Sequence, residues 1–370
     1  MKDKKSVLGA ASKAALGLGA AAAAAYGVYL LGGATRARRR PVTELAKSLD
    51  LRIAYTNWRG VHYAYYVRRG QGVPLVFLHS IDAVASAHEM RPLVRQLQLE
   101  TDRPVYALEW LGFGHSDRPE ISYTPELLED QLEHFLEKIV RAPAGADVIG
   151  LSLGATYAAD VARRRPDLVH SLVAIEPAGF GEEPSPIAEV WARLLFTLPG
   201  VQRAFYDRLT TPDALREFAA ENLFTDAYGV PEDFVRYGYE TARVEGASRP
   251  LDDFLSGRLF PDSGEESFRR LRQPLLVIHG TVQDRRMEQY TELPEIEARP
   301  GARVVAIEAG SMPHWERTDA VVREIRDFYR QIAERETPPT TEPAAADALG
   351  TAAAAADPAP VTESGAVTDA

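Results

Sequence analysis

Residues 150–154 have the sequence Gly-Leu-Ser-Leu-Gly, which could hold a serine hydroxyl at the tip of a sharp turn. They follow a short apolar run typical of a buried strand, and they precede a helical pattern that stops at Pro166. The glycines leave room where a Cβ would meet its neighbours, and the helix presents N–H groups to a developing oxyanion. The spacing predicts that Ser152 is a nucleophile for acyl transfer, with an ordinary tight turn as the alternative.

Around this turn, short apolar runs alternate with helical patterns between about Pro41 and Glu336. Thr124 and Pro125 have the residue types of an N-cap and a first helical position. The alternation predicts an α/β fold with a mostly parallel, doubly wound sheet, preceded by an antiparallel pair at 52–55 and 61–67. The runs are rich in Val, Ile and Leu, as buried strands are, and they span residues 75–79, 105–110, 148–152, 172–176, 275–279 and 304–308.

Residues 181–271 break the alternation. Their pattern is helical throughout, and it includes apolar side chains such as Val190, Trp191 and Leu194. They predict a helical cap inserted after the sixth strand, between two segments of the α/β core at 41–180 and 272–336.

The two ends of the chain differ from this block. Residues 1–40 contain an uncharged run from Ala14 to Ala34 with lysines before it and arginines after it, long enough to cross a bilayer core of about 30 Å. We expect a single-pass membrane anchor, with the globular domain on the cytoplasmic side because the arginine cluster follows the run. A cleaved signal peptide and a soluble Ala-rich helix are the alternatives. Residues 337–370 are mostly Pro, Ala and Thr and predict a disordered tail.

Composition narrows the possible functions. The 370 residues include 42 Lys and Arg against 53 Asp and Glu, a net charge of −11, so a nucleic-acid partner is not expected. There is no cysteine, which excludes disulfides, thiolate catalysis and cysteine-ligated zinc. No metal or organic cofactor is implied.

Three further segments follow predicted strands or precede the last predicted helix. They are Leu-His-Ser-Ile at 78–81, Leu-Gly-Phe-Gly-His-Ser-Asp-Arg-Pro at 111–119 and Met-Pro-His-Trp-Glu-Arg at 312–317. Together with the turn at 150–154 they resemble the α/β-hydrolase superfamily, in particular its capped serine esterases and lipases.

The resemblance implies an oxyanion hole made by the backbone N–H groups of Leu153 and Ile81. Ser80 stands where the family usually has glycine, so its hydroxyl could add a donor or tighten the loop. We expect His79 to make a structural hydrogen bond within this loop rather than to take part in the reaction.

The resemblance also implies the chain order serine, acid, histidine. Asp284, in the loop after the strand at 275–279, is the predicted acid, and Glu176 at the end of the sixth strand is the alternative.

The base is less regular than the acid. The position that holds the family's histidine is Ser311, and a serine hydroxyl cannot act as a general base near neutral pH. His314, about one helical turn further on, is the candidate base, and a packing role beside Trp315 is its alternative. His88 is a third candidate for the base.

These residues predict a serine hydrolase that cleaves a small hydrophobic carboxylic ester, or a related acyl bond, through an acyl-enzyme on Ser152. Haloalkane or epoxide chemistry would need a carboxylate at that position. The absence of histidine at position 311 raises an alternative, a catalytically impaired relative that binds a hydrophobic ligand or a protein partner.

Overall fold

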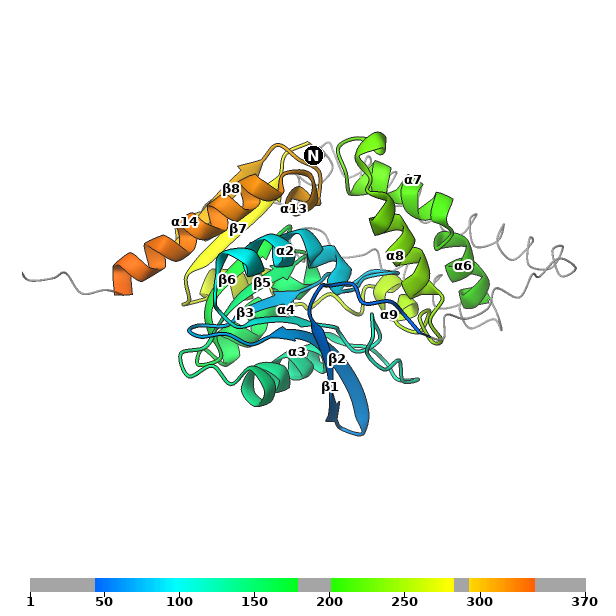
Figure 1. Cartoon of the computed structure of the whole chain (residues 1–370), viewed down its shortest axis with the longest axis horizontal. Helices are drawn as coiled ribbons and strands as arrows, with labels where there is room; N and C mark the ends of the chain where they lie inside the picture. Colours follow the sequence, from blue (N-terminus) through cyan, green and yellow to red (C-terminus); the bar gives the residue numbers. More distant parts are fainter. Residues whose placement is uncertain (1–43, 179–200, 283–292, 337–370) are drawn as a thin grey trace, which may run out of the picture.

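The computed structural model describes residues 44–178, 201–282 and 293–336. In these ranges one eight-stranded sheet forms the centre of the molecule (Figure 1). Its strands are β1 (Arg52–Trp58), β2 (Val61–Arg68), β3 (Leu75–Leu78), β4 (Val105–Leu108), β5 (Ala146–Leu151), β6 (Val169–Ile175), β7 (Leu275–Gly280) and β8 (Ala302–Ile307).

The sheet has the order β1-β2-β4-β3-β5-β6-β7-β8. β2 pairs antiparallel with β1 and with β4, and all other neighbours are parallel. The predicted α/β class is therefore confirmed, including the leading antiparallel pair. In the parallel pair of β3 and β5, Leu78 lies opposite Gly150, so the carboxyl ends of these strands are adjacent.

Helices cover both faces of the sheet, as a doubly wound fold requires. α3 and α4 pack on one face, and α2, α13 and α14 pack on the other (Figure 1). α10 packs against α4. Thr124 caps α3 as predicted, since its Oγ accepts a hydrogen bond of 3.3 Å from the Leu127 N–H. The covering elements are η1 (Ala87–Met90), α2 (Arg91–Glu100), α3 (Pro125–His134), η2 (Phe135–Val140), α4 (Leu153–Arg164), α10 (Gly264–Arg270), α12 (Leu293–Glu297), α13 (Pro313–Glu316) and α14 (Thr318–Glu336).

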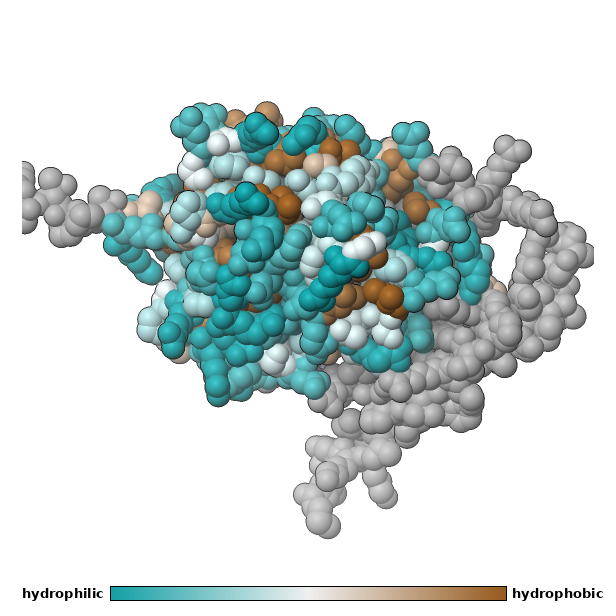
Figure 2. Space-filling view, turned by 90° about the horizontal axis from the view of Figure 1, so that it is seen from below, coloured by the Kyte–Doolittle hydropathy of each residue, from teal (hydrophilic) through white to brown (hydrophobic). Residues whose placement is uncertain are grey.

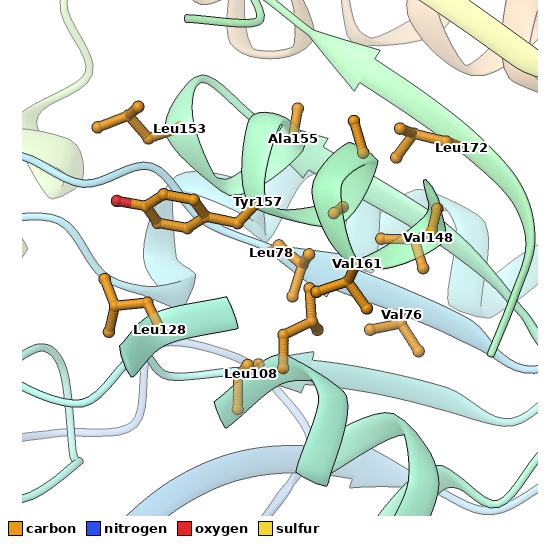
Figure 3. Close-up of a cluster of buried hydrophobic side chains, with 14 of the residues drawn as sticks. Val76, Leu78, Leu108, Leu128, Val148, Leu153, Ala155, Tyr157, Val161 and Leu172 are labelled. Atoms are coloured by element: carbon orange, nitrogen blue, oxygen red, sulfur yellow. The ribbon is translucent and has the colours of Figure 1, made fainter. Parts of the chain in front are cut away.

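Strand side chains alternate between two hydrophobic clusters, one on each face of the sheet. In β3, Val76 and Leu78 belong to the cluster under α3 and α4, and Leu75 and Phe77 belong to the cluster under α2 and α14. Figure 3 shows the first cluster, where strand residues such as Val76 lie against Val161 of α4. The face of the molecule in Figure 2 is mostly hydrophilic, with small hydrophobic areas between polar side chains.

A helical segment separates β6 from β7, in the range where the sequence predicts a cap. This segment contacts the loop after the carboxyl end of β3. The hydroxyl of Tyr206, in the first described helix, donates a hydrogen bond of 2.9 Å to the Ala83 carbonyl in that loop. Further along, Leu259 and Phe268 belong to the main core under α4. The described elements are α6 (Val201–Leu209), α7 (Pro212–Asn222), η3 (Ala227–Gly229), α8 (Glu232–Ala242) and α9 (Leu251–Leu255).

The predicted localisation as a single-pass membrane protein needs correction. No helix within 44–178, 201–282 and 293–336 is both long enough and apolar enough to cross a bilayer. The range 1–40, on which that prediction depended, lies outside the described residues, as do the predicted tail at 337–370 and the start of the predicted cap.

At the opposite, amino-terminal edge of the sheet, His170 joins the last helix to the strands. Its Nδ1 lies 2.7 Å from Asp147 Oδ1, and its Nε2 lies 2.8 Å from Glu336 Oε1 at the end of α14. Ser171 and Arg103 also bind the Asp147 carboxylate. The hydrogen bond to Asp147, more than that to Glu336, raises the pKa of His170 to about 9.

Replacing His170 by Ala should therefore destabilise the protein in a pH-dependent way. The folded pKa of about 9 lies above the ordinary value of 6.5. The stabilisation is thus fully present below about pH 6.5 and is lost as pH rises through about 9. Because His170 is partly exposed, we expect a modest effect: the free energy of unfolding of the wild type should exceed that of the variant by about 1 kcal/mol at acidic pH, as measured by urea unfolding. His62→Ala, a surface histidine, is the control, and an equal difference at pH 6 and pH 10 would contradict the assignment.

Candidate active site

Ser152 forms the turn between β5 and α4. Its backbone has φ 53° and ψ −126°, a region that non-glycine residues rarely occupy and that costs on the order of 1–3 kcal/mol. The Ser152 N–H donates a hydrogen bond of 2.9 Å to the Ile175 carbonyl, which keeps the turn attached to β6. The side chain does not cap α4, and the residue is partly exposed, so the hydroxyl is left for other contacts.

The two glycines of the motif allow this turn because backbone passes close to each of them. A Cβ on Gly150 would lie 2.6 Å from the Cα of Ala155, in the first turn of α4. A Cβ on Gly154 would overlap the carbonyl oxygen of His79, at the end of β3. Gly150 therefore lets the helix fold back on its own strand, and Gly154 lets the loop after β3 approach the helix.

The predicted oxyanion donors lie in these two approaching segments. Leu153 is the first residue of α4, where backbone N–H groups have no intrahelical acceptor. Ile81 lies in the loop after β3 and is 2% exposed. Neither N–H has a hydrogen-bond acceptor within the described part of the chain. The oxyanion role of these two groups stays a prediction.

His79 has the structural role expected for it. Its Nε2 accepts a hydrogen bond of 3.2 Å from the Trp110 N–H, so the proton is on Nδ1, which lies 2.7 Å from the Ser80 carbonyl. The ring is fully buried, and this burial lowers the pKa of His79 to about 3. A neutral ring with both nitrogens engaged serves the loop and not the reaction.

For the acid, the structure describes only the alternative residue, because Asp284 lies outside the described residues. Glu176 follows β6, is 3% exposed and has a left-handed φ of 44°. Its carboxylate accepts a hydrogen bond from the Gly280 N–H at the end of β7. A Cβ on Gly280 would in turn overlap the Gly310 carbonyl oxygen. Glu176 therefore lies beside the loop that leads to Ser311.

The two residues considered for the base position are both buried. Ser311 is 4% exposed, and His314 in α13 is completely buried. His314 Nε2 lies 2.9 Å from the Glu89 carbonyl oxygen, and its Nδ1 has no hydrogen-bond partner among the described residues. Burial lowers the pKa of His314 to about 4. Trp315 donates to the same carbonyl at 2.7 Å, which favours the packing role for His314 over that of a base.

His88, the third candidate, is stacked on Tyr237 with the ring centroids 4.5 Å apart, and burial lowers its pKa to about 4. In the part of the chain that the structure describes, the Ser152 hydroxyl has no hydrogen-bond partner. None of the chain's eight histidines, all of which lie in the described ranges, therefore forms a hydrogen bond with the Ser152 hydroxyl. Among the described residues, the structure brings together the turn at Ser152 and the loop after β3 that contains Ile81 (the predicted oxyanion loop), but not Ser152 and a predicted base.

Two buried carboxyl groups near the oxyanion loop escaped the sequence analysis, Glu89 and Glu109. Glu109 follows β4 and is fully buried; it accepts a hydrogen bond of 3.1 Å from Ala87 N–H and lies 3.4 Å from His79 Nε2. Burial raises the pKa of Glu109 to about 8, which the Ala87 N–H and Arg118 oppose only in part. An acidic residue within a run predicted to be a buried strand was the signal that could have found it.

The fold and these motifs define the class of protein. The Alpha/beta hydrolase family matches residues 75–324, more than half of the chain, so the chain belongs to that family. Human 1-acylglycerol-3-phosphate O-acyltransferase ABHD5 is 38% identical over 104 residues, which are 26% of this chain and 29% of that protein. The chain thus spans less than a third of that relative's length.

Longer but weaker similarities come from bacterial hydrolases. The 2-(acetamidomethylene)succinate hydrolase of Mesorhizobium japonicum is 27% identical over 230 residues, which are 57% of this chain and 72% of that enzyme. A solved Rhodococcus 2-hydroxy-6-oxo-6-phenylhexa-2,4-dienoate hydrolase superposes with a TM-score of 0.59 at 20% identity, covering 76% of this chain and 99% of that one. The solved structure supports the fold alone.

Replacing Glu109 by Gln should remove a pH dependence of stability. The folded pKa of about 8 lies above the ordinary 4.5, so the wild type loses stability as pH rises from about 4.5 to 8. Glutamine stays neutral and can still accept from the Ala87 N–H. The free energy of unfolding of the variant should therefore gain about 5 kcal/mol on that of the wild type between those pH values, at about 1.4 kcal/mol per pH unit. Urea unfolding at both pH values measures this, with the exposed Glu120→Gln as control. If the free energy of unfolding depended on pH in the same way for the wild type and Glu109→Gln, the raised pKa of Glu109 would be contradicted.

Proposed function

We propose that this alpha/beta hydrolase is a serine hydrolase that cleaves a small hydrophobic ester, or a related acyl bond, through Ser152. The observation that carries the proposal is the backbone of Ser152, at φ 53° and ψ −126°, with its hydroxyl free of any capping bond. A strained conformation of this kind is kept only where the surroundings enforce it, and such residues concentrate at active sites.

In the proposed reaction, Ser152 Oγ bonds to the acyl carbon while the carbonyl oxygen becomes an oxyanion held by the Leu153 and Ile81 N–H groups. A base takes the Ser152 proton as this bond forms and gives it to the alcohol, which leaves as the oxyanion collapses. Water then attacks the acyl carbon, a proton returns to Ser152 through the base, and the acid is released. Asp284 is the proposed acid and Glu176 its alternative. The relatives include hydrolases and a protein named as an acyltransferase, and an acyl-enzyme is compatible with both outcomes.

The proton relay distinguishes the main proposal from a second one. His314 can serve as the base only if its ring leaves the Glu89 carbonyl, to which it lies 2.9 Å, and moves towards Ser152. The buried, neutral state of that ring, together with Ser311 at the usual position, favours an impaired relative that binds a hydrophobic ligand or a protein partner.

A fluorophosphonate probe tests Ser152 directly. The wild type should be labelled once per chain, and Ser152→Ala should abolish the labelling, as read by intact-mass spectrometry. Ser171→Ala, which removes a buried hydroxyl at the opposite edge of the sheet, is the matched control and should remain labelled. Labelling that persists in Ser152→Ala would disprove the assignment of the nucleophile.

Ser311→His tests the relay. A histidine restored at this position should raise the hydrolysis of p-nitrophenyl butyrate at least about tenfold, because general base catalysis contributes roughly 10²–10⁴-fold. Ser311→Gln adds a side chain of similar length without a base and should not accelerate hydrolysis. If only Ser311→His is labelled and active, the impaired relative is supported. If the wild type is active and His314→Ala abolishes that activity, His314 is the base.

A further inference from the structure

Glu89 is a buried carboxyl group whose two oxygens bind the same residue. It lies in η1 and is 4% exposed. Glu89 Oε2 accepts a hydrogen bond of 2.8 Å from the Ser80 N–H, and Oε1 accepts one of 2.9 Å from the Ser80 hydroxyl. The serine that replaces the family's usual glycine therefore has a specific partner nine residues along the chain.

The carbonyl of Ser80 is held as firmly as its N–H and hydroxyl. His79 Nδ1–H donates to it at 2.7 Å, and the Trp110 N–H fixes the tautomer of that ring. Because the peptide group is planar and trans, the N–H of Ile81 points opposite to the Ser80 carbonyl. Fixing Ser80 on both sides therefore fixes the direction of the predicted oxyanion donor.

The same residue also touches the segment that contains the base position. The backbone carbonyl of Glu89 accepts hydrogen bonds from His314 Nε2 at 2.9 Å and from Trp315 Nε1 at 2.7 Å. α13, which contains both side chains, starts two residues after Ser311. Glu89 thus links two segments. Its side chain binds the predicted oxyanion loop, and its main-chain carbonyl binds the helix that follows Ser311.

We infer that Glu89 is a positioning residue for the oxyanion hole, acting through Ser80 to orient the Ile81 N–H. The inference rests on the proposed function, in which an acyl oxygen binds that N–H. It also explains Ser80, since a glycine there would keep the N–H bond to Glu89 and lose the hydroxyl bond.

A negative charge on Glu89 would repel a developing oxyanion and oppose the reaction. The surroundings of Glu89 favour its neutral, protonated form. Burial, followed by the neighbouring Asp82, raises the pKa of Glu89 well above its usual range, and Glu109 adds to the effect. A neutral side chain that keeps both bonds to Ser80 should therefore preserve the position of the loop. Glutamine has that form, because its oxygen can accept from the N–H while its amide donates to the hydroxyl.

The test compares rates of fluorophosphonate labelling per folded chain. Glu89→Ala should slow labelling at least about thirtyfold, since loss of one oxyanion donor costs roughly 10²–10³-fold. Glu89→Gln should stay within about threefold of the wild type. Glu129→Ala is the matched control, because Glu129 is also a buried glutamate, 6% exposed and paired with Arg164, but lies on α3. Hydrogen exchange of the peptide that contains residues 79–82 should speed up in Glu89→Ala only.

Labelling of Glu89→Ala at the wild-type rate would overturn the inference, as would an equal loss in Glu129→Ala. If the wild type itself is not labelled, the proposed function fails together with the oxyanion part of the inference, and hydrogen exchange then tests only whether Glu89 positions the loop. In that case, unchanged protection of residues 79–82 in Glu89→Ala overturns the positioning role, and selective loss of protection supports it.

Discussion

The turn at Ser152 is the constraint on which the rest of the site depends. Ser152 alone joins β5 to α4, and it does so with a positive φ. Other parts of the backbone pass close to Gly150 on one side of it and to Gly154 on the other. Since β3 lies next to β5 in the sheet, with Leu78 opposite Gly150, the loop after β3 begins beside this turn. The sheet order therefore places the oxyanion loop, and the contact of Gly154 with the His79 carbonyl sets how closely it approaches.

The strain at Ser152 is maintained because residues on both sides of it are buried in different cores. Ile149 and Leu151 belong to the cluster under α2 and α14, whereas Leu153 and Ala155 belong to the cluster under α3 and α4. Relaxing the turn would rotate residues of one cluster towards the other. Full burial of an aliphatic side chain contributes about 1.5–3 kcal/mol, so a few such residues outweigh the cost of the turn.

Much of the fold follows from local pattern, and the site follows from it only in part. The runs at 75–79 and 275–279 are buried strands because their Val, Ile and Leu content suits two covered faces, and the structure agrees. The hydrogen-bond partners of buried acids cannot be predicted in this way. Glu89 and Ser80 meet because of the path of a loop, which leaves no periodic pattern in the sequence. The predicted membrane anchor depended on one uncharged run with basic flanks, which lies outside the described residues, and none of the described helices is long and apolar enough to cross a bilayer.

The separation between an intact turn and a displaced base has a chemical meaning. Nucleophile, oxyanion hole and base contribute to different parts of the barrier, and in serine proteases the oxyanion hole and binding alone retain roughly 10³–10⁴-fold of the acceleration. In this chain the proposed nucleophile and the proposed oxyanion hole are constrained by packing, whereas His314, the proposed base, is a neutral ring that lies 2.9 Å from a main-chain carbonyl. If Ser152 is the nucleophile as proposed, such a site would favour electrophiles with good leaving groups, for which a base matters least. Ordinary alkyl esters would need His314 to move, and Glu89, which holds both loops, is the residue that resists that movement.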